Sequence, residues 1–141
     1  MTISTSPFGA GASPEAAAHY EPGVCNIGPA EIARRRMAGH VGLIATLAAL
    51  AVLILINAPP VTRLVAILPA AASASGYLQA WLKFCAGFGS RGIFNFGALG
   101  ESDTVADDGA RAIDRRRARQ IGLWAFAIGV VIGVVAMLLP I

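Results

Sequence analysis

Residues 37–85 read MAGHVGLIATLAALAVLILINAPPVTRLVAILPAAASASGYLQAWLKFC, and this stretch decides the fold. It contains two apolar runs, Met37–Ile56 and Val61–Phe84, separated by the short break Asn57–Pro60. The first run has 20 residues. At about 1.5 Å per residue, a helix of that length crosses about 30 Å of hydrocarbon. Because the break is short, the second helix must return antiparallel beside the first. We therefore predict a transmembrane hairpin over residues 25–85.

A third apolar run follows near the end of the sequence. Residues Ile121–Ile141 carry no charge, and a basic helix start precedes them from residue 111. The predicted fold class is therefore all-α integral membrane, with three transmembrane helices: the hairpin plus a third span over residues 111–141. Pro69 lies inside the second span, where it predicts a mild kink that nearby serines such as Ser73 could compensate.

The charges agree with a membrane protein. The 141-residue chain is 56% hydrophobic and only 13% charged, with a net charge of +3. Of the 11 Lys and Arg residues, all but Arg63 flank the spans on one side, which is the positive-inside pattern. We therefore expect a bacterial inner-membrane protein with its N-terminus in the cytoplasm and its C-terminus outside, and no nucleic-acid partner. Two basic clusters should anchor the chain to lipid headgroups: Arg34, Arg35 and Arg36, and Arg115, Arg116 and Arg117.

Two further segments complete the predicted organisation. Residues 1–24 are rich in Ser, Gly, Ala and Pro without an apolar core, so we expect a disordered cytoplasmic tail and no secretory signal. Residues 86–110 begin with a Gly-rich aromatic stretch that contains Phe88, Phe94 and Phe96, and end with an acidic loop. We interpret the aromatic stretch as an interfacial segment on the cytoplasmic face.

Small residues recur at four-residue spacing on one face of each predicted span. They include Gly42 in the first span and Gly76 in the second, and Ala125, Gly129 and Gly133 in the third. Such faces let membrane helices approach closely. The third span could use its face against the hairpin or against a second copy of the chain.

The two cysteines are the clearest candidates for chemistry. The hairpin places Cys25 just before the first span and Cys85 just after the second, at the same membrane face. A lasting disulfide is not expected in the cytoplasm, which keeps thiols reduced. Nearby cations such as Lys83 would favour a reactive thiolate, although isolated cysteines are more often structural. Two thiols alone do not make a zinc site, and no metal is predicted.

The sequence Cys25-Asn26-Ile27-Gly28, together with Phe84-Cys85 at the end of the hairpin, resembles a family of small bacterial two-helix membrane domains of unknown function. Its members begin with a Cys-Asn-Val-Gly signature and often end the second helix with Phe-Cys-Pro. Some are fused to rhodanese-type sulfurtransferase domains, so the resemblance implies a role in sulfur chemistry. This chain departs from the pattern: Ala86 replaces the proline, a third span is added, and no rhodanese domain is present.

The sequence contains no recognisable catalytic motif, so a non-enzymatic role is favoured. His40 is an intramembrane ionisable residue, but a bis-histidine haem would need a second one, and no cofactor is predicted. The leading hypothesis is a structural or accessory subunit of a membrane complex or homo-oligomer, in contact with lipid and with other subunits or itself. The alternatives are a thiol or persulfide carrier that uses Cys25 and Cys85, and a small-molecule transporter.

Overall fold

A computed structural model describes residues 20–141, and its architecture is mostly helical. Three helical segments are long and apolar enough to cross a membrane, as predicted. The elements follow in the order α2 (Pro29–Leu55), η1 (Pro60–Ala66), α3 (Ile67–Leu82), α4 (Ala86–Arg91), β1 (Ile93–Phe94), β2 (Asp103–Thr104) and α5 (Asp108–Leu138). The antiparallel pair β1–β2 is a small departure from the predicted all-α class.

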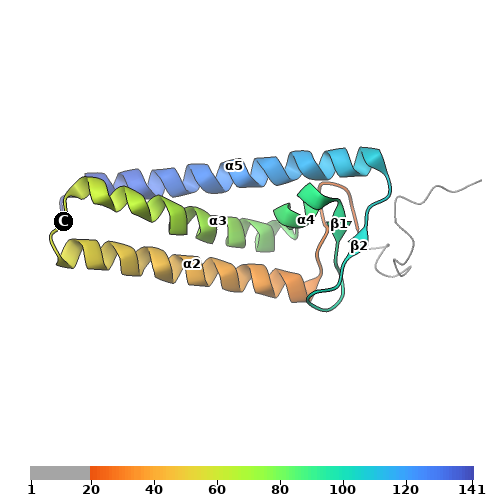
Figure 1. The fold of residues 1–141 in the computed structure, drawn as a ribbon, viewed down its shortest axis with the longest axis horizontal. Coiled ribbons are helices and arrows are strands. Elements are labelled where there is room, and N and C mark those ends of the chain that lie inside the picture. Colours follow the sequence, from red (N-terminus) through yellow and green to blue (C-terminus); the bar gives the residue numbers. More distant parts are fainter. Residues whose placement is uncertain (1–19) are drawn as a thin grey trace, which may run out of the picture.

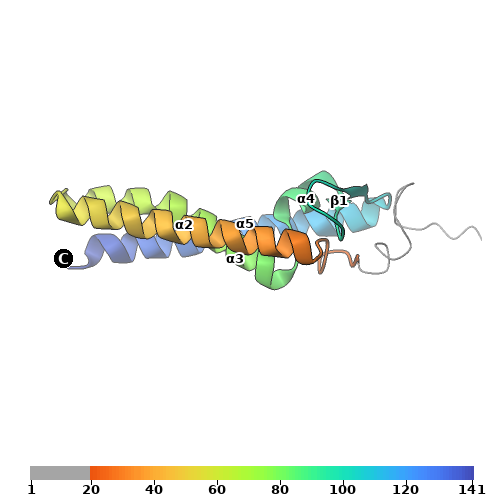
Figure 2. The same ribbon diagram turned by 90° about the horizontal axis from the view of Figure 1, so that it is seen from below.

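The long helices follow one another in space as they do in the sequence. Helix α3 lies in the middle, packed against α2 on one side and α5 on the other (Figure 1). The short elements α4, β1 and β2 gather at one end of the helices, beside the first described residues, and the C-terminus lies at the opposite end (Figures 1 and 2). Residues 20–28 and 83–107 and the first three turns of α5 form this compact end, which we call the head.

The break between the first two spans is a defined helix stop. Asn57 has a left-handed φ of 53°, and its N–H donates to the carbonyl of Ile54. The N–H of Ala58 donates to the carbonyl of Leu53. These two bonds form a Schellman motif, which satisfies carbonyls at the end of α2 that have no partner within the helix. The following prolines cannot continue α2, so the chain turns back at once.

Pro69 lies close to the point where the second span changes from one helix type to another. The span begins as a 3₁₀ helix, η1, and becomes α-helical at Ile67, so that Pro69 lies in the first turn of α3. A proline is tolerated in a first turn, where N–H groups lack α-helical partners. Ser73 does not compensate a broken bond, because its hydroxyl donates to the carbonyl of Gly39 on α2 at 2.8 Å.

Small residues bring α2 and α3 into close contact. Both Gly42 and Gly76 are buried. A Cβ added to Gly42 would lie 2.7 Å from the main-chain nitrogen of Ser73, and one added to Gly76 would lie 2.5 Å from that of Gly39. The two backbones therefore touch where glycine permits it, which is the close packing that small residues allow between membrane helices.

The small-residue face of α5 is also used within the chain. Ala125, Gly129 and Gly133 are all buried. A Cβ on Gly129 would lie 2.8 Å from the Cβ of Ala71 on α3, and Gly133 contacts the side chain of Ile67. Of the two partners open to this face from the sequence, the hairpin occupies it, and no room is left there for a second copy.

The aromatic segment after the hairpin faces protein rather than lipid. Phe94 is fully buried and Phe88 nearly so, within α4, β1 and the loops of the head. Phe94 packs with Tyr20, Val105 and Ala110 in one small core. The interfacial location of residues 86–100 stays a prediction, and these two rings contact protein, because the fold places them inside a small domain.

The head includes residues that the sequence assigned to the tail. The ring of Tyr20 stacks on Phe94 with centroids 4.9 Å apart, and its hydroxyl donates to the carboxylate of Asp114 at 2.5 Å. The N–H of Gly23 donates to the other oxygen of the same carboxylate at 2.8 Å. Residues 20–24 thus belong to the head, whereas the rest of the predicted tail lies outside the described residues.

Candidate functional site

The motif that begins at Cys25 forms the central junction of the head. The Asn26 side chain makes two hydrogen bonds to the main chain of Cys85: its amide oxygen accepts from the N–H at 2.7 Å, and its amide nitrogen donates to the carbonyl at 3.1 Å. The Asn26 main chain donates to the carbonyl of Lys83 and accepts from the N–H of Asn95. One buried asparagine therefore ties the entry of α2 to the end of α3 and to the strand region.

Gly28 and Ile27 have equally specific places in this junction. The N–H of Gly28 donates to the carbonyl of Asn95 at 2.8 Å. A Cβ on Gly28 would lie 2.8 Å from the main chain of Phe96, so only glycine fits without displacement. Ile27 is buried in a cluster with Cys85 and Phe88. The geometry thus gives three of the four motif residues a structural explanation.

The two cysteines are free thiols held at the same end of the molecule. Cys85 is only 1% exposed. Cys25 is partly buried, and its thiol donates a weak hydrogen bond to the carbonyl of Ile27 at 3.7 Å. Burial raises the pKa of Cys25, and this effect outweighs the opposite influence of Lys83. The structure therefore disfavours the reactive thiolate that the nearby cations suggested.

A buried carboxylate near the start of α2 is a feature that the sequence did not single out. Glu31 is 1% exposed. One of its oxygens lies 3.6 Å from a guanidinium nitrogen of Arg35, and the other lies 3.4 Å from the donating amide of Asn95. The guanidinium of Arg35 also lies over the ring of Phe88, 5.8 Å from its centroid. Glu31 thus serves the interior of the head as well as the first turn of a helix.

The predicted lipid anchors divide into two groups. Arg34, Arg36, Arg115 and Arg116 are exposed at the head end of α2 and α5, as an anchoring role requires, and one guanidinium nitrogen of Arg34 also lies 4.0 Å from a Glu31 oxygen. Arg35 and Arg117 are partly buried and turn toward the protein: Arg35 toward Glu31, and Arg117 over the ring of Trp124 at 5.7 Å. Sequence alone could not separate these groups, because all six lie in uniform basic runs.

His40 has a partner within the chain. Its Nδ1 lies 2.6 Å from the hydroxyl of Tyr77 on α3, and the two rings meet edge to face with centroids 5.3 Å apart. This pair links α2 to α3, and the hydrogen bond gives each polar group a partner on a largely apolar stretch of helix. The contact is a packing role for His40 that requires no cofactor.

Arg63 binds the far end of α5. It is 5% exposed, and its guanidinium donates to the carbonyls of Ala136 and Leu139, each at 3.0 Å, and to the main-chain oxygen of Ile141. The last carbonyls of a helix lack partners within the helix and carry partial negative charge. Arg63 therefore joins η1 to α5 at the end of the molecule opposite the head.

The described residues contain no cluster that would hold a metal: from Tyr20 to Ile141, no three His, Cys, Asp or Glu side chains converge. Of the acidic loop, Asp107 accepts a hydrogen bond from the N–H of Ala110 at 2.8 Å and thereby caps α5.

Comparison with protein families, with curated proteins and with solved structures gave no match to this chain.

Proposed function

We propose that this chain is a small multi-pass protein of the bacterial inner membrane that acts as a structural or accessory subunit of a membrane complex or of a homo-oligomer. The head would lie in the cytoplasm, where its exposed arginines meet anionic headgroups, and the C-terminus would lie outside. The helices are held together at both ends of the molecule: Asn26 ties the start of α2 to the end of α3 at the head, and Arg63 ties η1 to α5 at the far end. Such a molecule suits a structural role in a complex better than a catalytic role.

One observation carries this proposal: the spans put their large side chains outward. Only 17%, 28% and 28% of the most apolar windows of the three spans are buried inside the chain. On α2, Val41, Ile44 and Leu47 are 60%, 67% and 59% exposed, whereas the residues facing α3 are small. An apolar surface of this extent needs lipid or another apolar chain as its neighbour.

The internal packing also indicates which surface a neighbouring subunit would use. Gly42, Gly76 and Gly129 are already in contact within the chain, so these three glycines are not free for an intermolecular contact. Helix α2 is at one edge of the three-helix layer and packs on α3 through its buried residues Gly39, Gly42 and Thr46 (Figure 1). Its outer face, marked by Val41, Ile44 and Leu47, is therefore the favoured subunit surface.

The test is the native mass of the protein extracted in mild detergent, with every co-purifying chain identified. A cysteine at Ile44→Cys, in a chain whose own cysteines are serine, should cross-link to that neighbour. The matched control is Phe126→Cys, because Phe126 is 58% exposed on α5 and lies away from the α2 face. A protein that runs at monomer mass with no co-purifying chain, and in which Ile44→Cys cross-links no more than the control, would refute the proposal.

The thiol-carrier and transporter alternatives have less support. A persulfide carrier needs an accessible nucleophilic sulfur, whereas Cys85 is buried and the pKa of Cys25 is raised by burial. Trapping with a persulfide-selective reagent tests it, and a wild-type phenotype in the Cys25→Ser, Cys85→Ser variant would exclude it. A transporter needs polar groups that line a path for its substrate. The polar groups of the spans described here, such as His40 and Arg63, are instead hydrogen-bonded to partners within the chain.

A further inference from the structure

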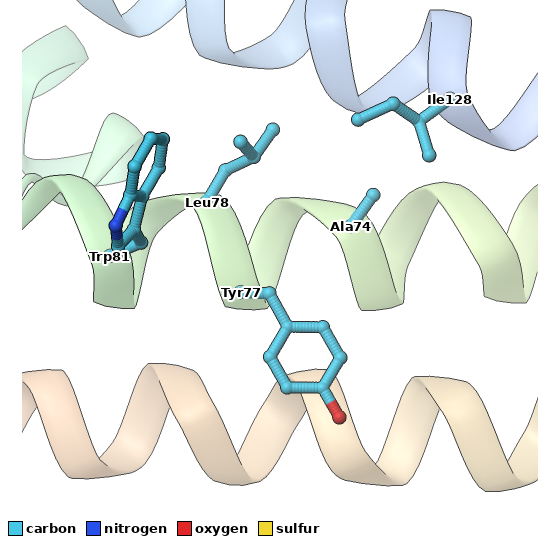
Figure 3. A pocket seen from close by; sticks show the side chains of 5 residues that line it. All are labelled: Ala74, Tyr77, Leu78, Trp81 and Ile128. Carbon is cyan, nitrogen blue, oxygen red and sulfur yellow. The ribbon is translucent and has the colours of Figure 1, made fainter.

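A shallow groove runs along the outer surface of α3 where α5 begins to diverge from it. It has a volume of about 320 Å³, and its walls are formed by Ala74, Tyr77, Leu78 and Trp81 of α3 and Ile128 of α5. Figure 3 shows Leu78, Ala74 and Ile128 in the space between the two helices, with Trp81 at one end. The lining is almost entirely apolar. The groove is therefore chemically complementary to a hydrocarbon chain.

A cation lies on the same face of α5, toward the head. Trp124 precedes Ile128 by four residues and follows Arg117 by seven, so the three share one face of the helix. The Arg117 guanidinium lies over the Trp124 ring, 5.7 Å from its centroid. The side chain thus extends along α5 toward the groove, although an arginine at this level usually turns toward water.

The same guanidinium has unused hydrogen-bonding capacity. The Nε of Arg117 is buried and has no hydrogen-bond partner within residues 20–141. No other nitrogen of this guanidinium has an acceptor within residues 20–141 either, so an acceptor from outside the chain would bind its terminal Nη groups rather than the buried Nε. Guanidinium groups bind phosphate oxygens through paired donors, and an anionic phosphate at headgroup level would lie beside the end of the groove.

We propose that the groove binds one acyl chain of an anionic phospholipid whose phosphate is held by Arg117. The apolar walls from Ala74 to Trp81 take the chain, the Trp124 ring lies at headgroup depth, and Arg117 supplies the charge. This site rests on the membrane location of the spans but not on a subunit role, because a single copy of the chain contains all of its parts.

The test is native mass spectrometry of the purified protein in nanodiscs that contain phosphatidylglycerol and phosphatidylcholine in equal amounts. We expect one retained lipid per chain, with phosphatidylglycerol preferred about fivefold, the effect of one arginine at a membrane surface. Arg117→Gln should abolish the preference. Arg116→Gln should lower it much less than Arg117→Gln does, because Arg116 is exposed and adds only to the diffuse positive charge of the same basic run. Ala74→Phe, which fills the groove, should lower retention of both lipids.

Two results would overturn this proposal. The first is equal retention of phosphatidylglycerol and phosphatidylcholine by the wild-type protein. The second is an equal loss of preference in Arg116→Gln and Arg117→Gln, which would mean that diffuse positive charge attracts lipid without a defined site. The arginine pair decides the outcome even if Ala74→Phe fails to fold. A monomeric protein that retains phosphatidylglycerol would refute the subunit proposal and leave the lipid site standing.

Discussion

Replacing Asn26 with alanine should open the head while the spans stay folded. The substitution removes both hydrogen bonds that the Asn26 side chain makes to the main chain of Cys85. The carbonyl of Cys85 keeps a second partner, since it also accepts from the N–H of Gly89 at 2.9 Å. The N–H of Cys85, by contrast, is left buried without an acceptor. The effect is confined to the place where α2, α3 and the head meet.

The magnitude follows from these two losses. A buried donor left without an acceptor costs about 1–3 kcal/mol, and the lost bond to the carbonyl adds about 1 kcal/mol, so the head should lose about 2–4 kcal/mol of stability. Each 1.4 kcal/mol changes an equilibrium tenfold. The population of the open head should therefore rise by a factor of about 30 to 1,000.

The Cys85 thiol is a built-in reporter of that opening, because the residue is 1% exposed when the head is closed. In a Cys25→Ser background, the rate of its modification by a maleimide measures the open fraction. Ser90→Ala is the matched control, since its exposed hydroxyl bonds only within α4. A modification rate in Asn26→Ala within about threefold of that control, at unchanged helical content, would refute the role of this asparagine.

Three further changes test other parts of the structure. Gly76→Ala should cost about 1–3 kcal/mol and lower the thermal midpoint in detergent, because its Cβ would lie 2.5 Å from the nitrogen of Gly39. Gly122→Ala is the control and should leave the thermal midpoint unchanged, because nothing lies within 4 Å of its Cβ. Equal midpoints for the two variants would contradict the close packing at Gly76. Arg63→Gln should speed amide exchange in the last turn of α5, where carbonyls lose their donor; unchanged exchange would exclude this cap. Because burial raises the pKa of Cys25, its alkylation rate should keep climbing beyond the usual thiol midpoint near pH 8.5, and a plateau below that pH would contradict the burial.

The sequence predicted the spans well, for reasons that are local. Apolar length defines a candidate span, and the break at Asn57 stops α2 through bonds to residues only a few positions away. The small faces at Gly42 and Gly129 were recognisable from spacing alone. Their partner was not, because spacing is the same whether the neighbour is another helix of the chain or another copy.

The head could not be predicted in this way, because distant residues build it. Tyr20 meets Asp114 across 94 positions, and Asn26 meets Cys85 across 59. Neither contact has a periodic signal. The aromatic residues near Phe94 were assigned to the membrane surface. The amino-acid composition of a segment is the same whether its rings are buried in a small domain or lie on lipid, so composition cannot distinguish the two. The sequence analysis singled out the two cysteines. In the structure, Asn26 explains more of the motif, because its side chain makes two hydrogen bonds to the main chain of Cys85.

The order of the helices has a consequence for how the protein is made. Helix α3 contacts α2, and α5 contacts α3, so each span can dock on the one synthesised before it. The segment that begins at Tyr20 must wait for Asp114, which is made 94 residues later. A nascent chain that stops before α5 would have its hairpin but no closed head. Closure of the head therefore requires the first turns of α5, and a protease that cleaves loose segments would distinguish chains with a closed head from chains that lack α5.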